Sequence, residues 1–389
     1  MATIKTGLEI LLTKKPEWIN SKKLGLLANP ASIASSLKNA VELINYHFPN
    51  QLKAIFSPQH GYYASKQDNM IESNNVIDPI LKLPVYSLYS KVRQPTKEMF
   101  KNIDILLIDL QDVGTRVYTF IYTISYCMEA CKLYNKKVVV LDRPNPIGGE
   151  TVEGNCVEEE FTSFVGRYSI PMRHGLTIGE LSYLFNDHFG IKSDLEVIPM
   201  QNWTRNMYFN DTDLTWITPS PNLPTPDSTI VYPGQVIWEG TNISEGRGTT
   251  KPFEIFGAPF LDTQKILEFL GPLPDVILRE TCFEPTFNKW HGHLCRGFQI
   301  HVTDLKNYKP YKTSLKILHA ILHVHPDKFA WKSPPYEYEF EKMPIDMILG
   351  SQKLRKSLEK NKVINNNLFD WQIDEEKFIE LSKKYLLYR

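Results

Sequence analysis

Residues 103–110 read Ile-Asp-Ile-Leu-Leu-Ile-Asp-Leu, and the polar segment Gln-Asp-Val-Gly-Thr-Arg follows directly at 111–116. The apolar run lacks strict alternation, which is typical of a strand covered on both faces of a parallel sheet. Stretches long enough for helices follow, notably Val117–Tyr134 and Thr177–Phe189. The sequence therefore predicts an α/β fold with a Rossmann-like parallel sheet. Five further runs of this kind supply its other strands: Lys23–Ala28, Leu52–Phe56, Pro84–Leu88, Lys137–Leu141 and Leu195–Pro199.

The pattern of apolar runs alternating with helix-length stretches ends near Pro199. Residues 219–226 read Pro-Ser-Pro-Asn-Leu-Pro-Thr-Pro, which is too rich in proline for a helix or a central strand. Beyond this connection we expect a strand at Gly297–Thr303, a helix at Thr313–His323 and a closing amphipathic helix near Asp374–Leu387. We therefore expect a Rossmann-like α/β domain over residues 1–200 and a smaller α+β domain over residues 201–389.

The balance of charges limits the classes of partner. The chain has 389 residues, with 44 Lys and Arg against 44 Asp and Glu. It therefore lacks the basic surface that a nucleic-acid backbone or an anionic membrane would require, and a small molecule is the expected ligand. Neither a signal peptide nor a membrane-spanning run is evident, so we expect a cytoplasmic protein. Five cysteines without metal-type spacing fit free thiols.

No cofactor or metal is expected. Neither a G-x-G-x-x-G nor a Walker sequence follows any predicted strand, which argues against nucleotide binding. His319 and His323 have the spacing of a zinc-protease motif, but the glutamate between them is missing.

Polar residues gather where the predicted strands end, and open α/β sheets bind ligands at this edge. An acid held there can be partly desolvated, so Asp109 and Asp112 are candidates for acid catalysis. Helix capping is the alternative role of Asp112. Asp142 and Arg143 are candidates for substrate binding, and their alternative is an internal ion pair. The remaining candidates for substrate binding in such segments are Gln59, His60, Arg116, Asn145, Arg173 and His174.

A glycine-rich stretch over residues 236–250 reads Val-Ile-Trp-Glu-Gly-Thr-Asn-Ile-Ser-Glu-Gly-Arg-Gly-Thr-Thr. Glycine permits tight turns and close approach to a ligand, while Glu and Arg supply proton transfer and anion binding. We therefore expect an active-site loop in which Glu239 is catalytic and Asn242, Glu245 and Arg247 bind substrate; the alternative is a surface turn with a solvated charge pair. Glycoside hydrolysis usually uses an acid and a second carboxylate. The pool for such a pair is Glu239, Glu245, Asp109, Asp112 and Asp142.

Several sequence blocks occur in a fixed order along the chain. They are N-P-A-S from Asn29, S-P-Q-H-G from Ser57, D-V-G-T-R-V-Y-T from Asp112, L-D-R-P-N-P from Leu141, V-E-G-N from Val152, P-M-R-H-G-L-T-I-G-E from Pro171 and E-G-T-N-I-S-E-G-R-G-T-T from Glu239. Together, from roughly Lys23 to the C-terminus, they resemble the bacterial DUF1343 family, which is associated with exo-β-N-acetylmuramidases of the NamZ type.

The resemblance implies a site in the cleft between the two domains. It also implies release of terminal N-acetylmuramic acid from the non-reducing end of peptidoglycan fragments, so the expected partner is a carbohydrate. The lactyl carboxylate of this sugar would be bound in fork geometry by Arg116, Arg143, Arg173 or Arg247.

One block departs from the family. Many members have Glu where this chain has Gln59, and an amide cannot transfer a proton as a carboxyl group does. We therefore expect Glu239 to be the acid, and the substrate's own acetamido oxygen can serve as the nucleophile. Two alternatives remain open: a binding protein for such sugars without hydrolysis, and a hydrolase of another N-acetylated acidic sugar.

Overall fold

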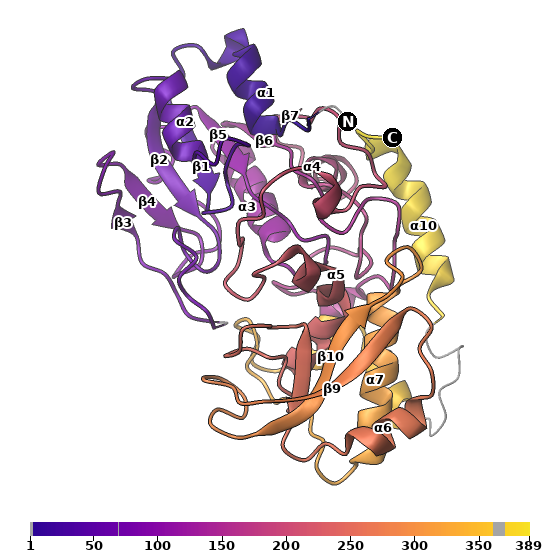
Figure 1. Ribbon diagram of the computed structural model, residues 1–389. Coiled ribbons are helices and arrows are strands. Elements are labelled where there is room, and N and C mark those ends of the chain that lie inside the picture. Colours follow the sequence, from indigo (N-terminus) through magenta and orange to yellow (C-terminus); the bar gives the residue numbers. More distant parts are fainter. Residues whose placement is uncertain (1–2, 69, 361–369) are drawn as a thin grey trace.

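The apolar run at 103–110 forms β5 (Ile105–Asp109), an interior strand of the larger sheet. It pairs in parallel with β1 (Leu24–Ala28) and with β6 (Lys137–Leu141). All five residues of β5 are buried, which explains why the sequence does not alternate. The computed structural model describes residues 3–68, 70–360 and 370–389 (Figure 1).

The larger sheet has seven strands in the order β3-β4-β2-β1-β5-β6-β7. Its remaining strands are β2 (Leu52–Ser57), β3 (Val76–Ile77), β4 (Pro84–Ser87) and β7 (Leu195–Ile198). Every pair is parallel except β3 with β4 at one edge. The predicted α/β class and all six predicted strands are confirmed, whereas β3 was missed because it has only two residues. The strand order reverses between β1 and β5, the place where such sheets bind ligands.

Helices cover both faces of this sheet. On one face, Ile105 and Leu107 of β5 share a core with α1 (Gly7–Lys14) and α2 (Ala40–His47). On the other face, Leu106 and Ile108 pack in the core that includes α3 (Phe120–Leu133) and α4 (Ile178–Asp187). Thr177 and Glu180 form a capping box at the start of α4. Single-turn 3-10 helices η1 (Glu17–Ile19), η2 (Glu159–Phe161) and η3 (Phe209–Asp211) lie in the connections.

The second unit is built on a three-stranded antiparallel sheet in the order β8-β10-β9. The expected strand and helix correspond to β10 (Cys295–Val302) and α7 (Pro310–Val324). Figure 1 shows this unit, in orange, below the larger sheet. Its other elements are α5 (Pro226–Gln235), η4 (Val236–Gly240), β8 (Ile255–Ala258), α6 (Thr263–Leu270), β9 (Val276–Phe283), α8 (Pro344–Leu349) and α9 (Gln352–Lys360).

The end of the chain returns to the first unit. Helix α10 (Gln372–Ser382) and η6 (Lys383–Tyr385) run back along the molecule, so that both termini lie at the same end in Figure 1. The Tyr388 hydroxyl donates to Asp142 Oδ2 at 2.5 Å, and the Leu387 amide donates to Glu180 Oε1 at 2.9 Å. The C-terminal segment, which the sequence assigned to the second domain, therefore packs on the first.

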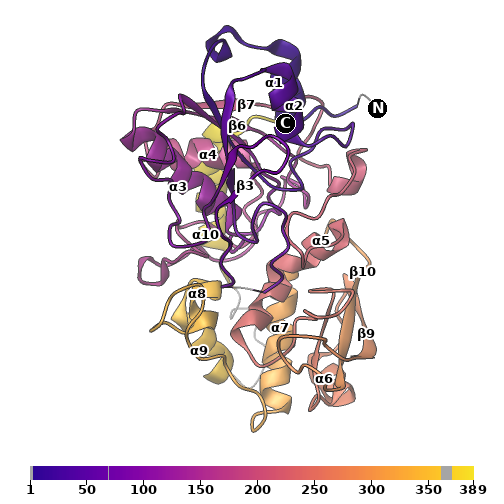
Figure 2. The ribbon, with the colours of Figure 1, turned by 90° about the vertical axis from the view of Figure 1, so that its left-hand side faces the viewer.

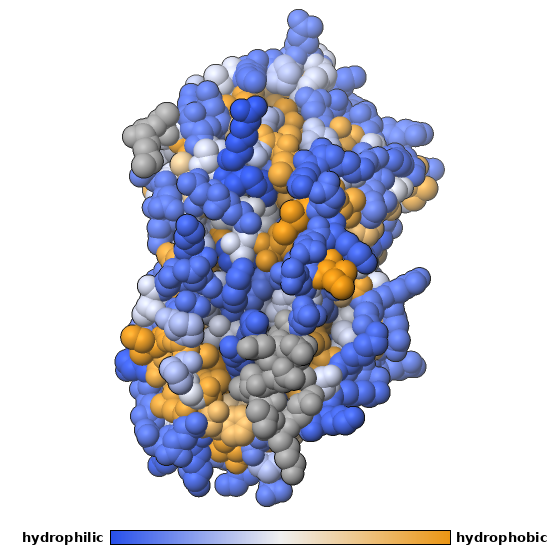
Figure 3. Space-filling model, turned by 90° about the vertical axis from the view of Figure 1, so that its right-hand side faces the viewer, coloured by the Kyte–Doolittle hydropathy of each residue, from blue (hydrophilic) through white to orange (hydrophobic). Residues whose placement is uncertain are grey.

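Hydrophilic residues predominate on the face drawn in Figure 3, and apolar residues gather in separate areas, one of them toward the lower left of the view. Within the described residues, no helix combines the length and the apolar character needed to cross a bilayer.

Helices α5 and α7 approach closely at Gly234 (Figure 2). A Cβ atom at this position would lie 2.0 Å from the Pro310 carbonyl oxygen and 2.3 Å from Ser314 Oγ. Both α5, which carries Tyr232, and the following η4, which carries Glu239, are held at this junction.

The substitution Gly234→Ala should lower the free energy of unfolding by roughly 1–3 kcal/mol, because the added methyl group forces the helices apart. Urea denaturation measures this loss. The control is Gly166→Ala, where the nearest atom to an added Cβ is a Val157 side-chain methyl at 3.3 Å rather than backbone at 2.0 Å. Equal stability of the two variants would contradict the proposed constraint on α5 and α7.

Candidate active site

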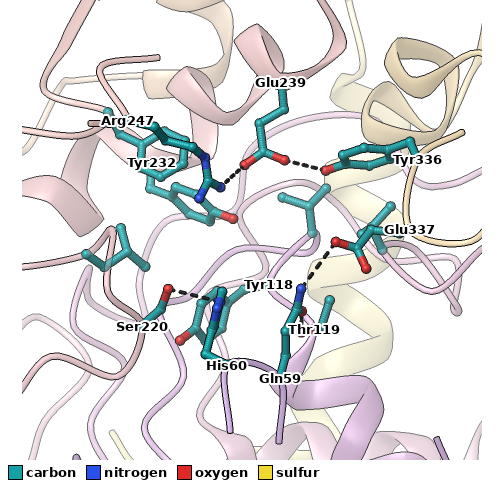
Figure 4. Close-up of a pocket in the computed structure, with 14 residues that line it drawn as sticks. Gln59, His60, Tyr118, Thr119, Ser220, Tyr232, Glu239, Arg247, Tyr336 and Glu337 are labelled. Carbon is teal, nitrogen blue, oxygen red and sulfur yellow. Dashed lines mark hydrogen bonds and ion pairs between the residues drawn. The ribbon is translucent and has the colours of Figure 1, made fainter. Parts of the chain in front are cut away.

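A cavity lies where the two units meet, and it encloses about 400 Å³ of empty space, part of it open to solvent. Figure 4 shows Gln59, His60, Tyr118 and Thr119 of the first unit on one side, with Glu239, Arg247 and Tyr336 of the second unit opposite. Its described lining residues are Gln59, His60, Val117, Tyr118, Thr119, Val165, Ser220, Leu223, Tyr232, Glu239, Arg247, Phe253, Tyr336 and Glu337.

His60 reaches the cavity through a sharp turn after β2. The turn is possible because His60 and Gly61 adopt positive φ angles of 72° and 80°. His60 Nδ1 lies 2.6 Å from the Lys66 carbonyl oxygen and must donate to it, so Nε2 is left as an acceptor 3.2 Å from Ser220 Oγ. Burial, aided by the charge of Arg247, lowers the pKa of His60 to about 4. The ring is therefore neutral near pH 7 and accepts hydrogen bonds at the cavity wall.

Glu239 and Arg247 form a buried ion pair. Arg247 Nη2 lies 2.5 Å from Glu239 Oε1, and Arg247 Nε donates to Glu245 Oε1 at 3.0 Å. The hydroxyl of Tyr336 donates to the other Glu239 oxygen at 2.6 Å. One oxygen of the Glu239 carboxyl group is therefore held by a cation and the other by a hydroxyl donor.

Lys289 completes this network, and sequence patterns did not indicate it. Its ammonium group donates to Glu245 Oε2 at 2.7 Å and to the carbonyl oxygens of Trp238 and Ile243. Burial opposes ionisation of Glu245, but the charges of Lys289 and Arg247 outweigh it and hold the pKa of Glu245 below its ordinary value. Glu245 thus fixes the glycine-rich loop from behind the cavity, which it does not line.

Glu337 is the second carboxyl group among the described residues of the cavity wall, and sequence analysis missed it. Its oxygens accept from the Tyr89 hydroxyl at 2.6 Å and from Gln59 Nε2 at 3.2 Å. Burial, reinforced by the negative charge of Glu239, raises the pKa of Glu337. No motif marks this residue; only the docking of the 331–342 segment against Gln59 and Tyr89 brings it to the cavity.

Tyr118 lines the cavity with a hydroxyl group that has no hydrogen-bond partner within the part of the chain that the structure describes. The residue is buried, and a buried hydroxyl without a partner is costly. A polar group of a ligand would satisfy it.

Several predicted site residues lie outside the cavity wall. Asp109 and Arg143 pair with each other through two hydrogen bonds, of 2.5 and 2.8 Å. Arg116 donates to three carbonyl oxygens, those of Asn155, Ile170 and Ile348, and so joins the two units. These guanidinium groups hold the fold rather than face the cavity.

Asp112 and Asp142 also make internal contacts. Asp112 Oδ2 accepts from the Gly114 amide at 2.8 Å and lies 3.3 Å from His174 Nε2, behind the cavity wall. Asp142 accepts from Thr177, Gly179 and Tyr388. The last three predicted binding residues bond to backbone outside the cavity: Asn145 to Leu176, Arg173 to Ile147 and Asn242 to Lys328.

Metal ligands are not grouped in this site. Among residues 3–68, 70–360 and 370–389, no cluster of three or more His, Cys, Asp or Glu side chains could hold an ion.

Two family models together match almost the whole chain. The model described as exo-β-N-acetylmuramidase NamZ, N-terminal, matches residues 24–227, and its C-terminal counterpart matches residues 230–388. The chain belongs to the exo-β-N-acetylmuramidase NamZ family. A curated NamZ relative, peptidoglycan β-N-acetylmuramidase of Bacillus subtilis (strain 168), is 43% identical over 99% of this chain and 91% of its own length.

Two solved structures of DUF1343 family proteins share this fold. A DUF1343 family protein of Bacteroides fragilis NCTC 9343 matches with a TM-score of 0.90 and 32% identity, covering 100% of both chains. A second protein of that organism and family matches with a TM-score of 0.77 and 28% identity, covering 100% of this chain and 99% of its own.

The pairing of Asp109 with Arg143 predicts a structural effect. Asp109→Asn should lower the free energy of unfolding by roughly 3–5 kcal/mol, because it leaves the buried guanidinium without its counter-ion. Chemical denaturation measures this, with Asp104→Asn at the exposed start of the same run as control. Unchanged stability together with a large loss of turnover would instead make Asp109 a catalytic residue.

The neutral state of His60 predicts a pH dependence of stability. An unfolded imidazole takes up a proton near its ordinary pKa of 6.5, whereas buried His60 stays neutral until about pH 4. The free energy of unfolding should therefore fall by roughly 3 kcal/mol between these pH values. Denaturation of the native protein and of His60→Gln across this range isolates the contribution, and parallel curves would refute it.

Proposed function

We propose that this protein is an exo-β-N-acetylmuramidase that releases terminal N-acetylmuramic acid from peptidoglycan fragments. Its membership of the NamZ family, which extends through both halves of the chain, carries this proposal. The cavity between the two units supports it, since an exo-acting glycosidase needs a pocket that takes one terminal sugar.

The chemistry of the cavity fits glycoside hydrolysis. Two carboxyl groups, those of Glu239 and Glu337, line it within the described residues. An ionised carboxylate stabilises the positive charge that develops on the sugar ring or orients the acetamido group for attack on the anomeric carbon. Glu239, which pairs with Arg247 and accepts from Tyr336, suits this role better than the proton-donor role that its sequence suggested.

The polar wall suits a sugar. Tyr118 offers a hydroxyl group without a partner in the described structure, and the Ser220 hydroxyl, which donates to His60 Nε2, keeps its acceptor capacity. Both hydroxyl groups can therefore bond to substrate hydroxyl groups. Of the four arginines considered for the lactyl carboxylate, Arg247 alone lines the cavity, and it provides the positive charge there.

The test is hydrolysis of a chromogenic β-N-acetylmuramide beside the corresponding N-acetylglucosaminide. We expect release from the muramide alone, because the lactyl carboxylate contributes to recognition. In Glu239→Gln, kcat should fall by roughly 10²–10⁴-fold, since the charge that stabilises the transition state is lost. The matched control is Glu254→Gln, which also removes a buried, ion-paired carboxylate but lies outside the cavity wall.

Absence of turnover on both substrates would contradict the proposal. Calorimetry with N-acetylmuramic acid then identifies the alternative raised by Gln59, a protein that binds the sugar without cleaving it. Equal turnover on the two substrates would instead identify a hydrolase with no requirement for the lactyl group.

A further inference from the structure

The two carboxyl groups of the cavity lie in opposite electrostatic surroundings. Glu239 contacts the guanidinium of Arg247 at 2.5 Å. Within the described residues, the donors at hydrogen-bond distance from Glu337 are both neutral: the Tyr89 hydroxyl and the Gln59 amide. When the surroundings of two acids separate their proton affinities, the acid without a counter-ion keeps its proton at higher pH.

We propose that Glu337 is the proton donor of the hydrolysis, an inference that rests on the proposed glycosidase function. The Glu337 carboxyl proton moves to the glycosidic oxygen, and the bond between the anomeric carbon and this oxygen breaks with its electron pair on oxygen. The oxygen of one water bonds to the anomeric carbon, and one of its protons restores the Glu337 carboxyl group.

Gln59 can form a hydrogen bond with Glu337 both when Glu337 is protonated and when it is ionised. Its amide nitrogen lies 3.2 Å from Glu337 Oε1, and its carbonyl oxygen accepts from Thr119 Oγ1 at 2.5 Å. The nitrogen donates to an ionised Glu337. After a half-turn of the amide, the carbonyl oxygen accepts from a protonated Glu337 while the nitrogen donates to the Thr119 hydroxyl. Gln59 is therefore a positioning residue that supports both states of the acid.

The backbone places Glu337 at the cavity at an energetic cost. Tyr336 and Glu339 bridge the ends of a tight turn, whose central residues Glu337 and Tyr338 have φ angles of 47° and 67°. Non-glycine residues adopt this conformation infrequently, because it brings the Cβ atom too close to the following carbonyl oxygen. Such turns usually hold Asn and Gly, so a buried Glu here indicates that its side chain serves a purpose other than folding.

The groups that face Glu337 determine whether its pKa lies above or below the ordinary value. Burial and the negative charge of Glu239 raise its pKa, while the hydrogen bonds from Tyr89 and Gln59 and the positive charge of Arg93 lower it by less. A substrate carboxylate in the same cavity would raise the pKa further. The titratable or charged groups facing Glu337 come from three segments: Tyr89 and Arg93 after β4, Glu239 and Tyr232 from η4 and α5, and Tyr336 from its own turn.

Substrates with different leaving groups distinguish proton donation by Glu337 from other roles of this residue. We compare Glu337→Gln with the native enzyme on an N-acetylmuramic acid–N-acetylglucosamine disaccharide and on a 2,4-dinitrophenyl β-N-acetylmuramide. The sugar leaving group needs a proton, so kcat/KM should fall by roughly 10²–10⁴-fold. Dinitrophenolate leaves without a proton, so the loss on this substrate should stay below roughly tenfold. The control is Glu339→Gln, which removes a carboxylate from the same turn outside the cavity wall.

The pH profile supplies a second readout. Activity of the native enzyme should decline as the pH rises through the raised pKa of Glu337 and this residue loses its proton. In Tyr89→Phe this decline should move to higher pH, because the Tyr89 hydrogen bond stabilises the ionised form.

Equal losses on the two substrates, or no loss on either, would overturn the role of Glu337 while leaving the glycosidase function intact. A native enzyme that cleaves neither substrate would instead overturn the proposed function itself.

Discussion

The buried guanidinium of Arg247 is the interaction on which the site depends. A charge removed from water must be paired, and Arg247 is paired with Glu239 in the cavity and with Glu245 behind it. Lys289 balances the second carboxylate and ties it to the backbone at Trp238 and Ile243. The glycine-rich loop therefore keeps its shape through two basic and two acidic side chains. The other carboxyl group of the cavity, that of Glu337, has no salt-bridge partner within the described residues.

The larger sheet brings the first half of the site to this network. The turn after β2 delivers Gln59 and His60, and the segment before α3 delivers Tyr118 and Thr119. These positions follow the rule that open α/β sheets bind ligands at the carboxyl ends of their strands. The second unit supplies the acids. Neither unit holds all the side chains of the cavity. A change in the packing between the units, or in the close contact of α5 and α7, should therefore alter the positions of these side chains and the activity.

The sequence predicted the large sheet well because buried parallel strands leave continuous apolar runs, as at 103–110. It also selected Gln59, His60, Glu239 and Arg247 as candidate site residues because they lie in polar segments that contain glycine, and all four line the cavity. It could not find Glu337, whose contact with Gln59 joins positions 278 residues apart. Nor could it distinguish Arg116, whose charge is buried against backbone carbonyl oxygens, from an arginine facing a ligand. Such contacts depend on how the two units pack against each other, which no local sequence pattern indicates.

The central claim is that Glu337 holds its proton more tightly than an ordinary glutamate, because it is buried and lies near the negative charge of Glu239. Carbon-13 NMR of protein labelled at the glutamate carboxyl carbons measures this directly, with Glu337→Gln used to assign the signal. The account predicts that Glu337 titrates above the ordinary glutamate pKa of 4.5, in the direction set by its burial. A Glu337 signal that titrates at or below the ordinary value would contradict the account.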